Sequence, residues 1–246
     1  GGGVSEWRVI CGDALEVLRG MEPESVDAIV TDPPYAISVK GSVHHGQPGS
    51  GSRSLDFFPG DDDWPAQRAL VCAVLGESIR VLARLGTMYW WCGHRQFGDI
   101  VERCERAGFK TRFLVWAKSC PAPPPPWSGW PSGAELCVYA FRPGRTWNLG
   151  PACAPRSNVF TADSYRFGQP GKEDHPTQKP LDVIEPLILA STKPGDLVLD
   201  PFAGSGTVGV VALRHGRRFI GIDISADYCA MARRRIAGPL FAEVVP

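Results

Sequence analysis

A strand, a glycine-rich turn and a helix follow one another late in the chain, and this succession most narrows the folds open to it. The apolar run Leu197–Asp200 has the composition of a buried strand, and 208–213 has that of a helix. Between them lies Pro-Phe-Ala-Gly-Ser-Gly-Thr, whose glycines let a ligand approach the backbone and the start of the helix. A further short strand, 218–223, ends in Asp223, about where an α/β nucleotide site places the acid that binds ribose hydroxyls. The pattern therefore predicts an α/β fold with a ligand at this turn.

The same stretch also satisfies the dinucleotide-binding pattern G-x-G-x-x-G, from Gly204 to Gly209. A nicotinamide-dependent dehydrogenase is therefore an alternative. Its fold needs several βα units after the pattern, whereas Asp223 is followed here only by residues 224–246. The units that complete the sheet must come from upstream, so the position of the pattern argues against a dehydrogenase.

The motif Asp-Pro-Pro-Tyr at residues 32–35 follows another apolar run, Val26–Thr31, which is typical of a strand. Two prolines lack N–H donors and fix φ, so Asp32 and the Pro33 carbonyl are presented as acceptors beside the ring of Tyr35. Acceptors without donors, together with a ring face, suit a planar group that carries an amino substituent, such as a nucleobase. A plain strand-to-loop turn is the alternative, because Asp and Pro are common in turns.

Two more motifs flank these. The first, Cys-Gly-Asp-Ala-Leu at 11–15, runs from a strand-like pair into an amphipathic stretch, where capping of a helix is an alternative role for Asp13. The second, His-Pro-Thr-Gln-Lys-Pro at 175–180, precedes an apolar helical run, and the alternative is a loop whose Pro180 begins that helix.

These four motifs, in this order, resemble those of the amino-group DNA methyltransferases that use S-adenosylmethionine. The resemblance is to the permuted subgroup in which the DPPY motif precedes the cofactor-binding glycine loop, and it covers nearly the full chain. It implies an α/β, Rossmann-like methyltransferase fold with a seven-stranded, mostly parallel sheet and helices on both faces. It also implies one methyltransferase domain, residues 1–246, with a small target-recognition insert at about 119–174.

The implied reaction is direct in-line transfer of a methyl group to the exocyclic N6 amine of adenine in DNA. In the family, the Asp32 carboxylate and the Pro33 carbonyl would accept hydrogen bonds from that amine, while Tyr35 would stack on the base. The implied catalytic set is Asp32, Pro33, Pro34 and Tyr35. Such a base must be flipped out of a duplex or already unpaired. The reaction needs no metal and no covalent intermediate.

The resemblance further implies a cofactor site. Residues 202–207 would wrap the methionine moiety with Asp200 near its amino group, and Asp223 would accept from the ribose hydroxyls. Residues 177–179 would close the methionine end, although a solvated surface charge is an alternative for Lys179. The full implied set is Asp13, Ala14, Asp32, Thr177, Gln178, Lys179, Asp200, Phe202, Ala203, Gly204, Ser205, Gly206, Thr207 and Asp223.

The motif fixes the target base less tightly than it fixes the reaction. In this family, a catalytic tetrad that begins with Asp goes with adenine more often than with cytosine. Cytosine N4, RNA and single-stranded DNA stay open as alternative targets. A binding module without activity is a further alternative, which the intact Asp32 disfavours. Ring-carbon cytosine methyltransferases use a cysteine that usually follows a proline, and no cysteine follows a proline here.

Composition limits the partners. Lys plus Arg equals Asp plus Glu, at 26 each, which argues against a binder that relies on bulk positive charge. We expect DNA phosphates to be contacted by arginines of the recognition segment, namely Arg142, Arg145, Arg156 and Arg166. For the Arg233–Arg235 run, a solvated helix end is the favoured interpretation.

The eight cysteines form no C-x-x-C pair, so a zinc site is not expected. The sequence shows no signal peptide and no apolar stretch near 18 residues, which predicts a cytoplasmic protein of bacterial or phage origin with no membrane partner. Relatives of the permuted type often form homodimers, so a homodimer stays open.

Local patterns also predict the remaining elements. We expect a mobile Gly/Ser-rich loop at 41–60 and extended polyproline structure at 121–126. We expect helices from residue 63 to about 85 and over 96–107, with strands over 87–92, 109–118 and 135–142. Residues 143–174 lack periodicity and are expected to be irregular.

Overall fold

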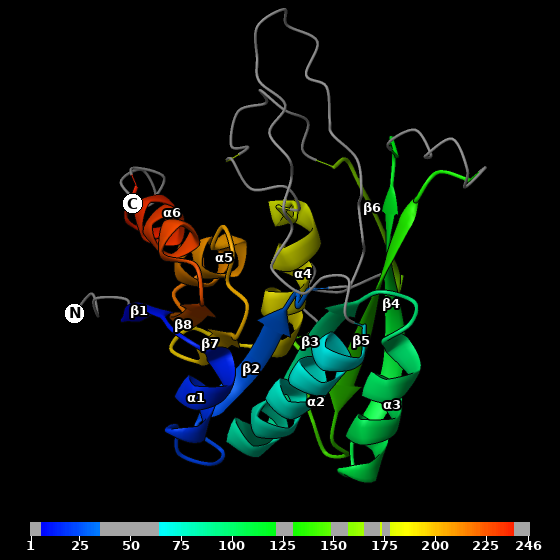
Figure 1. Cartoon of the computed structure of the whole chain (residues 1–246), viewed down its shortest axis with the longest axis horizontal. Helices are drawn as coiled ribbons and strands as arrows, with labels where there is room; N and C mark the ends of the chain where they lie inside the picture. The colour runs from blue at the N-terminus through cyan, green and yellow to red at the C-terminus, as the bar shows by residue number, and fades with distance from the viewer. Residues whose placement is uncertain are drawn as a thin grey trace, which may run out of the picture.

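The computed structural model describes residues 6–34, 64–121, 130–148, 157–164, 173 and 178–238. Within these ranges, eight strands form one sheet in the order β1-β8-β7-β2-β3-β5-β4-β6 (Figure 1). The strands are β1 (Trp7–Cys11), β2 (Val26–Thr31), β3 (Leu82–Cys92), β4 (Lys110–Lys118), β5 (Ala134–Phe141), β6 (Val159–Ala162), β7 (Leu197–Asp200) and β8 (Arg218–Asp223). The helices are α1 (Ala14–Arg19), α2 (Trp64–Val81), α3 (Phe97–Arg106), α4 (Leu181–Ser191), α5 (Thr207–Arg214) and α6 (Ala226–Ala237).

The sheet is mostly parallel, as predicted. All neighbouring pairs from β1 to β3 are parallel, and β5 alone runs antiparallel, between β3 and β4. The predicted count of seven strands differs by one from the eight in the described residues. The additional strand is β6, which pairs in parallel with the end of β4 at the sheet edge. It lies in the segment expected to be irregular, and four residues are too few to carry a recognisable alternation.

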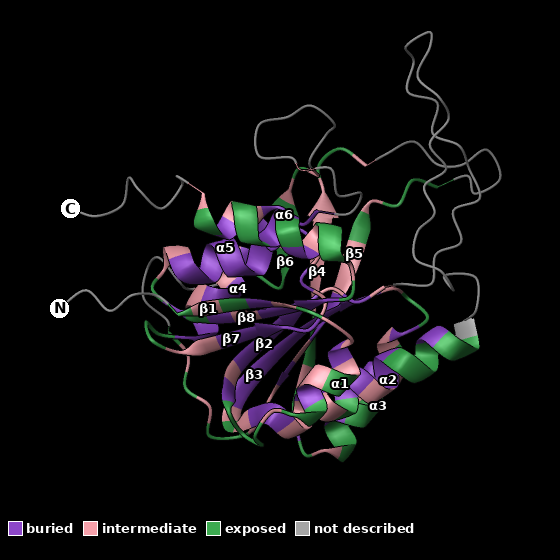
Figure 2. Ribbon diagram, turned by 60° about the vertical axis from the view of Figure 1, so that its left-hand side comes forward, coloured by how far each residue is buried: buried purple, intermediate pink, exposed green. Residues whose placement is uncertain are grey.

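Helices cover both faces of the sheet, also as predicted (Figure 2). One apolar core lies between the sheet and α1, α2 and α3, and another lies between the sheet and α4, α5 and α6. Because successive side chains of a strand point to opposite faces, adjacent residues of β3 serve different cores. Trp90 packs in the first core, and Trp91 packs in the second.

Most predicted boundaries agree with the structure, and β2, β7 and β8 have the predicted residues. The predicted end of the second helix at about Leu85 is wrong: α2 ends at Val81, and β3 begins at Leu82. An apolar run of this length fits either element on pattern alone. Pairing of Leu82 with Val26 of β2 places it in the sheet.

The proposed recognition insert is not separate from the sheet where the structure describes it. Both β5 and β6 fall within residues 119–174, and both pair with β4. Several predicted features lie outside the described residues, namely Tyr35, the loop at 41–60, residues 122–126 of the proline-rich run, Arg156, Arg166, and Thr177.

No helix among the described residues is both long enough and apolar enough to cross a membrane.

One edge of the sheet collects the functional motifs. The parallel strands β1, β7, β8 and β2 all end there, and β5, being antiparallel, begins there. Chain order reverses between β7 and β2, because β8 and β1 lie on one side of this pair and β3 on the other. Open α/β sheets bind ligands at such a reversal. The fold therefore places the site beside Asp32 and Asp200.

Candidate active site

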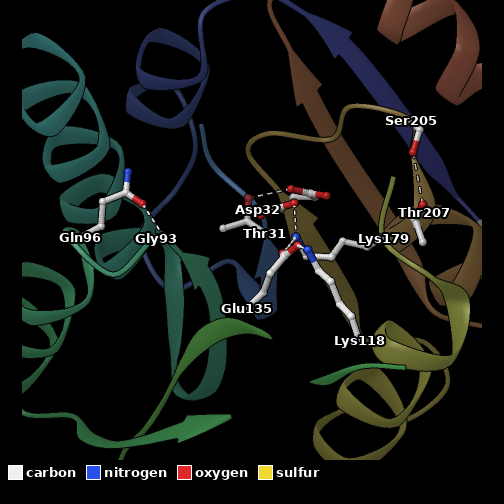
Figure 3. A network of polar contacts seen from close by, with 10 residues as sticks. Thr31, Asp32, Gly93, Gln96, Lys118, Glu135, Lys179, Ser205 and Thr207 are labelled. Carbon is white, nitrogen blue, oxygen red and sulfur yellow. Dashed lines mark hydrogen bonds and ion pairs between the residues drawn. The ribbon is translucent and has the colours of Figure 1, made fainter. Parts of the chain in front are cut away.

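The Asp-Pro-Pro turn leaves β2 at this edge and is held in place from the direction of α3. The side-chain amide of Gln96 donates from Nε2 to the Pro34 carbonyl at 2.8 Å. Its Oε1 accepts from the Gly93 backbone at 3.1 Å (Figure 3). Gln96 is only 2% exposed. The sequence predicts this residue only as the start of a helix, and no local pattern indicates its contact with the turn.

The Asp32 carboxylate belongs to a chain of charges at the centre of the site (Figure 3). Its Oδ2 lies 2.5 Å from Lys179 Nζ, which lies 2.7 Å from Glu135 Oε2. Glu135 Oε1 in turn lies 2.8 Å from Lys118 Nζ. The Lys179 side chain is only 6% exposed, so the alternative of a solvated surface charge is wrong for it.

The ionisation of this chain follows from its partners. Burial would lower the pKa of Lys179, but the carboxylates of Asp32 and Glu135 raise it above its usual value. Burial would likewise raise the pKa of Glu135, yet the ammonium groups of Lys179 and Lys118 hold it down at about 2. Lys179 and Glu135 are therefore charged at neutral pH.

Asp200 lies at the end of β7, next to this chain. Its Oδ1 accepts from the Thr31 hydroxyl at 2.7 Å and from the Phe202 backbone at 3.1 Å. Burial raises the pKa of Asp200 to about 7, and the nearby carboxylates of Asp32 and Asp223 add to the rise. Three carboxylates that repel one another at one strand edge suit a ligand that carries positive charge and hydroxyl donors.

The glycine turn between β7 and α5 is tightly packed. Gly206 has φ +76°, and a Cβ added there would lie 2.8 Å from the Cβ of Ala232 on α6. A Cβ at Gly209 would lie 2.6 Å from side-chain atoms of Phe219 and of Ile236. Glycine at 206 permits the left-handed turn, and glycine at 209 permits close packing of α5 on the sheet.

Two side chains hold this turn from outside. Asp223 accepts from the Gly204 backbone at 2.9 Å and from the Ser225 backbone at 2.8 Å. Arg235 donates to the Ser205 carbonyl at 2.6 Å and approaches the Thr207 hydroxyl at 3.2 Å. The interpretation of the arginine run as a solvated end is therefore wrong for Arg235, whose side chain is only 10% exposed.

The first motif reaches the same edge. Asp13 is the N-cap of α1, accepting from the Glu16 backbone at 3.0 Å, so the capping alternative is confirmed. The neighbouring Gly12 backbone donates to the Asp223 carbonyl at 2.9 Å, and Ala14 is buried beside it. Asp13 and Ala14 therefore lie close to the end of β8 and to Asp223.

The structure thus brings most described members of the predicted set to one strand edge. Gln178 is buried and accepts from the Glu173 backbone at 2.8 Å. Trp116, a core residue at 3% exposure, places its ring 5.8 Å from Lys179 Nζ. Sequence reasoning did not identify Thr31 or Glu135 as members of the site.

Two predicted DNA contacts are not at this edge. Arg142 and Arg145 follow β5, whose last residue, Phe141, pairs with Lys110, the first residue of β4. Arg142 lies over the Phe109 ring at 4.1 Å, and Arg145 donates to the Leu85 carbonyl at 2.8 Å. Both arginines therefore pack away from the functional strand edge, and their contact with DNA phosphates stays a prediction.

Known proteins are similar to this chain in sequence and in fold. The Type II methyltransferase M2.DpnII of Streptococcus pneumoniae is 32% identical over 242 residues, and the match covers 93% of this chain and 88% of the length of M2.DpnII. The crystal structure of an M1.HpyAVI-SAM complex is 24% identical, with a TM-score of 0.69 over 94% of this chain and 100% of its own. The cytosine-N4-specific PvuII DNA methyltransferase is 18% identical, with a TM-score of 0.73 over 98% of this chain and 89% of its own.

The family itself is settled by a match along most of the chain. The sequence profile of the N6_N4_Mtase family, described as DNA methylase, matches residues 26–234. The matched range includes the Asp-Pro-Pro turn and the glycine turn, which meet at the same strand edge. The chain therefore belongs to the N6/N4 DNA methylase family.

Proposed function

We propose that the protein transfers a methyl group from S-adenosylmethionine to the exocyclic N6 amine of adenine in DNA. The observation that carries the proposal is the placement of Asp32 beside the glycine turn, across the β2–β7 pair where chain order reverses. Family membership supports the reaction class, and the Asp that opens the motif supports adenine. The relative M2.DpnII carries the name of a Type II methyltransferase, which supports a role in DNA modification.

The residues fit the cofactor. S-adenosylmethionine carries a sulfonium, an ammonium and ribose hydroxyls. Its positive charges and hydroxyl donors are complementary to the carboxylates at this edge. In our proposal, Asp200 faces the ammonium, and residues 202–207 enclose the methionine moiety. Asp223 keeps lone pairs beyond its two backbone partners and accepts from the ribose. Asp13 and Ala14 lie toward the adenine.

The chemistry then depends on Asp32 and its turn. The cofactor supplies an electrophilic methyl group on a sulfonium. The exocyclic amine is a weak nucleophile, because its lone pair is delocalised into the ring. In our proposal, the Asp32 carboxylate and the Pro33 carbonyl accept hydrogen bonds from the two N–H groups, which frees that lone pair, and Tyr35 stacks on the flipped base. Positioning and charge complementarity supply most of the acceleration.

The burial of Asp200 predicts a pH dependence of cofactor binding. A cationic ligand binds the ionised carboxylate, so affinity grows as Asp200 loses its proton near pH 7, the value to which burial raises its pKa. Between about pH 6 and about pH 7.5 we expect the association constant to rise roughly tenfold. The Asp200→Asn variant should bind more weakly and lose the slope. Calorimetric titration across this range, with the exposed Asp227→Asn as control, tests the prediction, and a flat wild-type profile would contradict it.

Cytosine N4 is the second candidate. Its support is the PvuII enzyme, which is cytosine-N4-specific and shares the fold at a TM-score of 0.73. The same two acceptors would serve the cytosine amine, so the described geometry accommodates either base.

The deciding experiment measures methyl transfer from labelled S-adenosylmethionine to unmethylated duplex DNA, single-stranded DNA and RNA in parallel. Digestion to nucleosides and mass spectrometry then identify the product. We expect N6-methyladenine from DNA and none with Asp32→Ala. N4-methylcytosine would replace the leading proposal with the second candidate, and a product from RNA alone would replace DNA as substrate. Failure to bind the cofactor would overturn the proposal altogether.

A further inference from the structure

Four charged residues from four elements form a continuous chain that no sequence motif contains as a whole (Figure 3). Asp32 follows β2, Lys179 precedes α4, Glu135 is the second residue of β5 and Lys118 is the last residue of β4. The three contacts measure 2.5, 2.7 and 2.8 Å in that order. Asp32 and Lys179 belong to family motifs, whereas Glu135 comes from a strand with no motif.

These four charged side chains are largely shielded from water. The side chains of Glu135 and Lys118 are each 18% exposed, Asp32 is 24% exposed and Lys179 is 6% exposed. The Trp91 ring lies 5.2 Å from Lys179 Nζ, and the Trp116 ring lies 5.2 Å from Lys118 Nζ. In such surroundings each charge depends strongly on its partner, and a buried charge that loses its partner is costly.

Glu135 is the link that fixes the direction of Lys179. A lysine has four flexible side-chain bonds and no preferred planar geometry, so contact with Asp32 alone would leave the ammonium free to turn about it. Glu135 supplies a second acceptor from the opposite side, and Lys118 holds the other oxygen of Glu135. The ammonium of Lys179 is thereby held between the carboxylates of Asp32 and Glu135.

We infer that Glu135 is a positioning residue for the proposed methyl transfer, holding the Lys179 ammonium against Asp32 so that this carboxylate stays charged and correctly aimed. Lys118 supports Glu135 in the same way. The inference rests on the proposed function, because it concerns the acceptor that activates the target amine. It assigns Lys179 to the carboxylate and not to the closing of the methionine end.

The first test is the pH dependence of kcat in Glu135→Gln, which keeps the shape of the side chain and removes its charge. Without the Glu135 carboxylate, Lys179 is no longer held against Asp32, and the loss of this cation raises the pKa of Asp32. The acidic limb of the pH profile of kcat, where activity falls as Asp32 is protonated, should therefore move to higher pH by about one unit. At neutral pH we expect kcat to fall on the order of tenfold. If Glu135 were only a neighbouring anion, its removal would move the limb to lower pH and overturn the inference.

The other titratable groups near Asp32 do not confuse this comparison. The thiols of Cys92 and Cys137 are buried, which raises the pKa of each well above its usual value and keeps both neutral. Asp200, whose pKa is raised to about 7, is present in every variant. The shift between variants is therefore the quantity to measure, with Glu102→Gln, an exposed carboxylate on α3, as the matched control.

A double-mutant cycle gives the second test. If Glu135 acts through Lys179, Glu135→Gln should reduce kcat no further in a Lys179→Gln background. Independent, multiplying losses would overturn the inference. Glu135→Asp, which keeps the charge, should return the acidic limb toward the wild-type position, and it also serves if Glu135→Gln does not fold. Cofactor affinity should change less than about twofold in the Glu135 variants.

Failure of the inference and failure of the proposed function give different results. If the wild-type protein methylates DNA but the acidic limb of the pH profile of kcat does not shift in Glu135→Gln, only the role of Glu135 is overturned. A wild-type protein that methylates no nucleic acid overturns both.

Discussion

Replacing Asp32 with alanine should reduce methyl transfer by roughly 10³-fold or more, because the variant loses the charged acceptor that activates the amine. Cofactor binding should persist, since the glycine turn is held by Asp223 and Arg235. Lys179 keeps its contact with Glu135 in this variant, so the buried ammonium is not left alone. Single-turnover methylation at saturating DNA and cofactor measures the loss, and calorimetry measures cofactor binding.

Two companion variants sharpen this prediction. Asp32→Asn keeps the volume but presents an N–H where an acceptor is needed, so it should be nearly as inactive as alanine. Asp227→Asn removes an exposed carboxylate on α6 and should leave activity unchanged. Near wild-type transfer by Asp32→Ala would show that the amine is activated by some other group.

Replacing Gly206 with alanine should disrupt both stability and cofactor binding. The residue has φ +76°, where an L side chain is strained by roughly 1–2 kcal/mol. The added Cβ would also lie 2.8 Å from the Cβ and 3.0 Å from the Cα of Ala232, so α5 and α6 would have to separate. Together we expect the free energy of unfolding to fall by about 2–4 kcal/mol. Chemical denaturation and cofactor titration measure the two effects.

A matched glycine separates this effect from substitution as such. Gly98 lies in α3, and a Cβ added there would meet nothing within 4 Å. Gly98→Ala should therefore stabilise the protein by about 0.5–1 kcal/mol. Adding Ala232→Gly to Gly206→Ala should recover the part of the loss due to the Ala232 Cβ but not the part due to φ. Wild-type stability and cofactor affinity in Gly206→Ala would contradict the packing described for the turn.

The sequence predicted those parts of the fold that depend on local signals. The runs of β2, β7 and β8 are apolar, short and bounded by Asp, so their extent could be predicted. Each run ends in, or is followed directly by, one of Asp32, Asp200 and Asp223, and parallel strands bring such ends to one edge of a sheet. The class of fold followed from the same alternation of strands and helices.

What could not be predicted depends on contacts between distant residues. Glu135 and Lys118 are charged residues in strands, and nothing nearby in the chain indicates that either faces Lys179. Arg235 looks like any basic helix end, because its bond to the Ser205 carbonyl exists only once α6 packs on the glycine turn. The strand β6 is defined by its pairing with β4 and by no alternation of its own.

The first and last strands of the described sheet, β1 and β8, are far apart in the sequence but pair with each other. β1 and β8 are neighbours in the sheet, and Arg233 near the end of α6 donates to the Val9 carbonyl at 2.7 Å (Figure 1). A circular permutation that links the end of α6 to the start of β1 by a short linker, and opens the chain in another loop, should leave the residues of the strand edge in place. The strand edge therefore depends on which strands are neighbours in the sheet, and the order of the motifs along the sequence is not what brings them together.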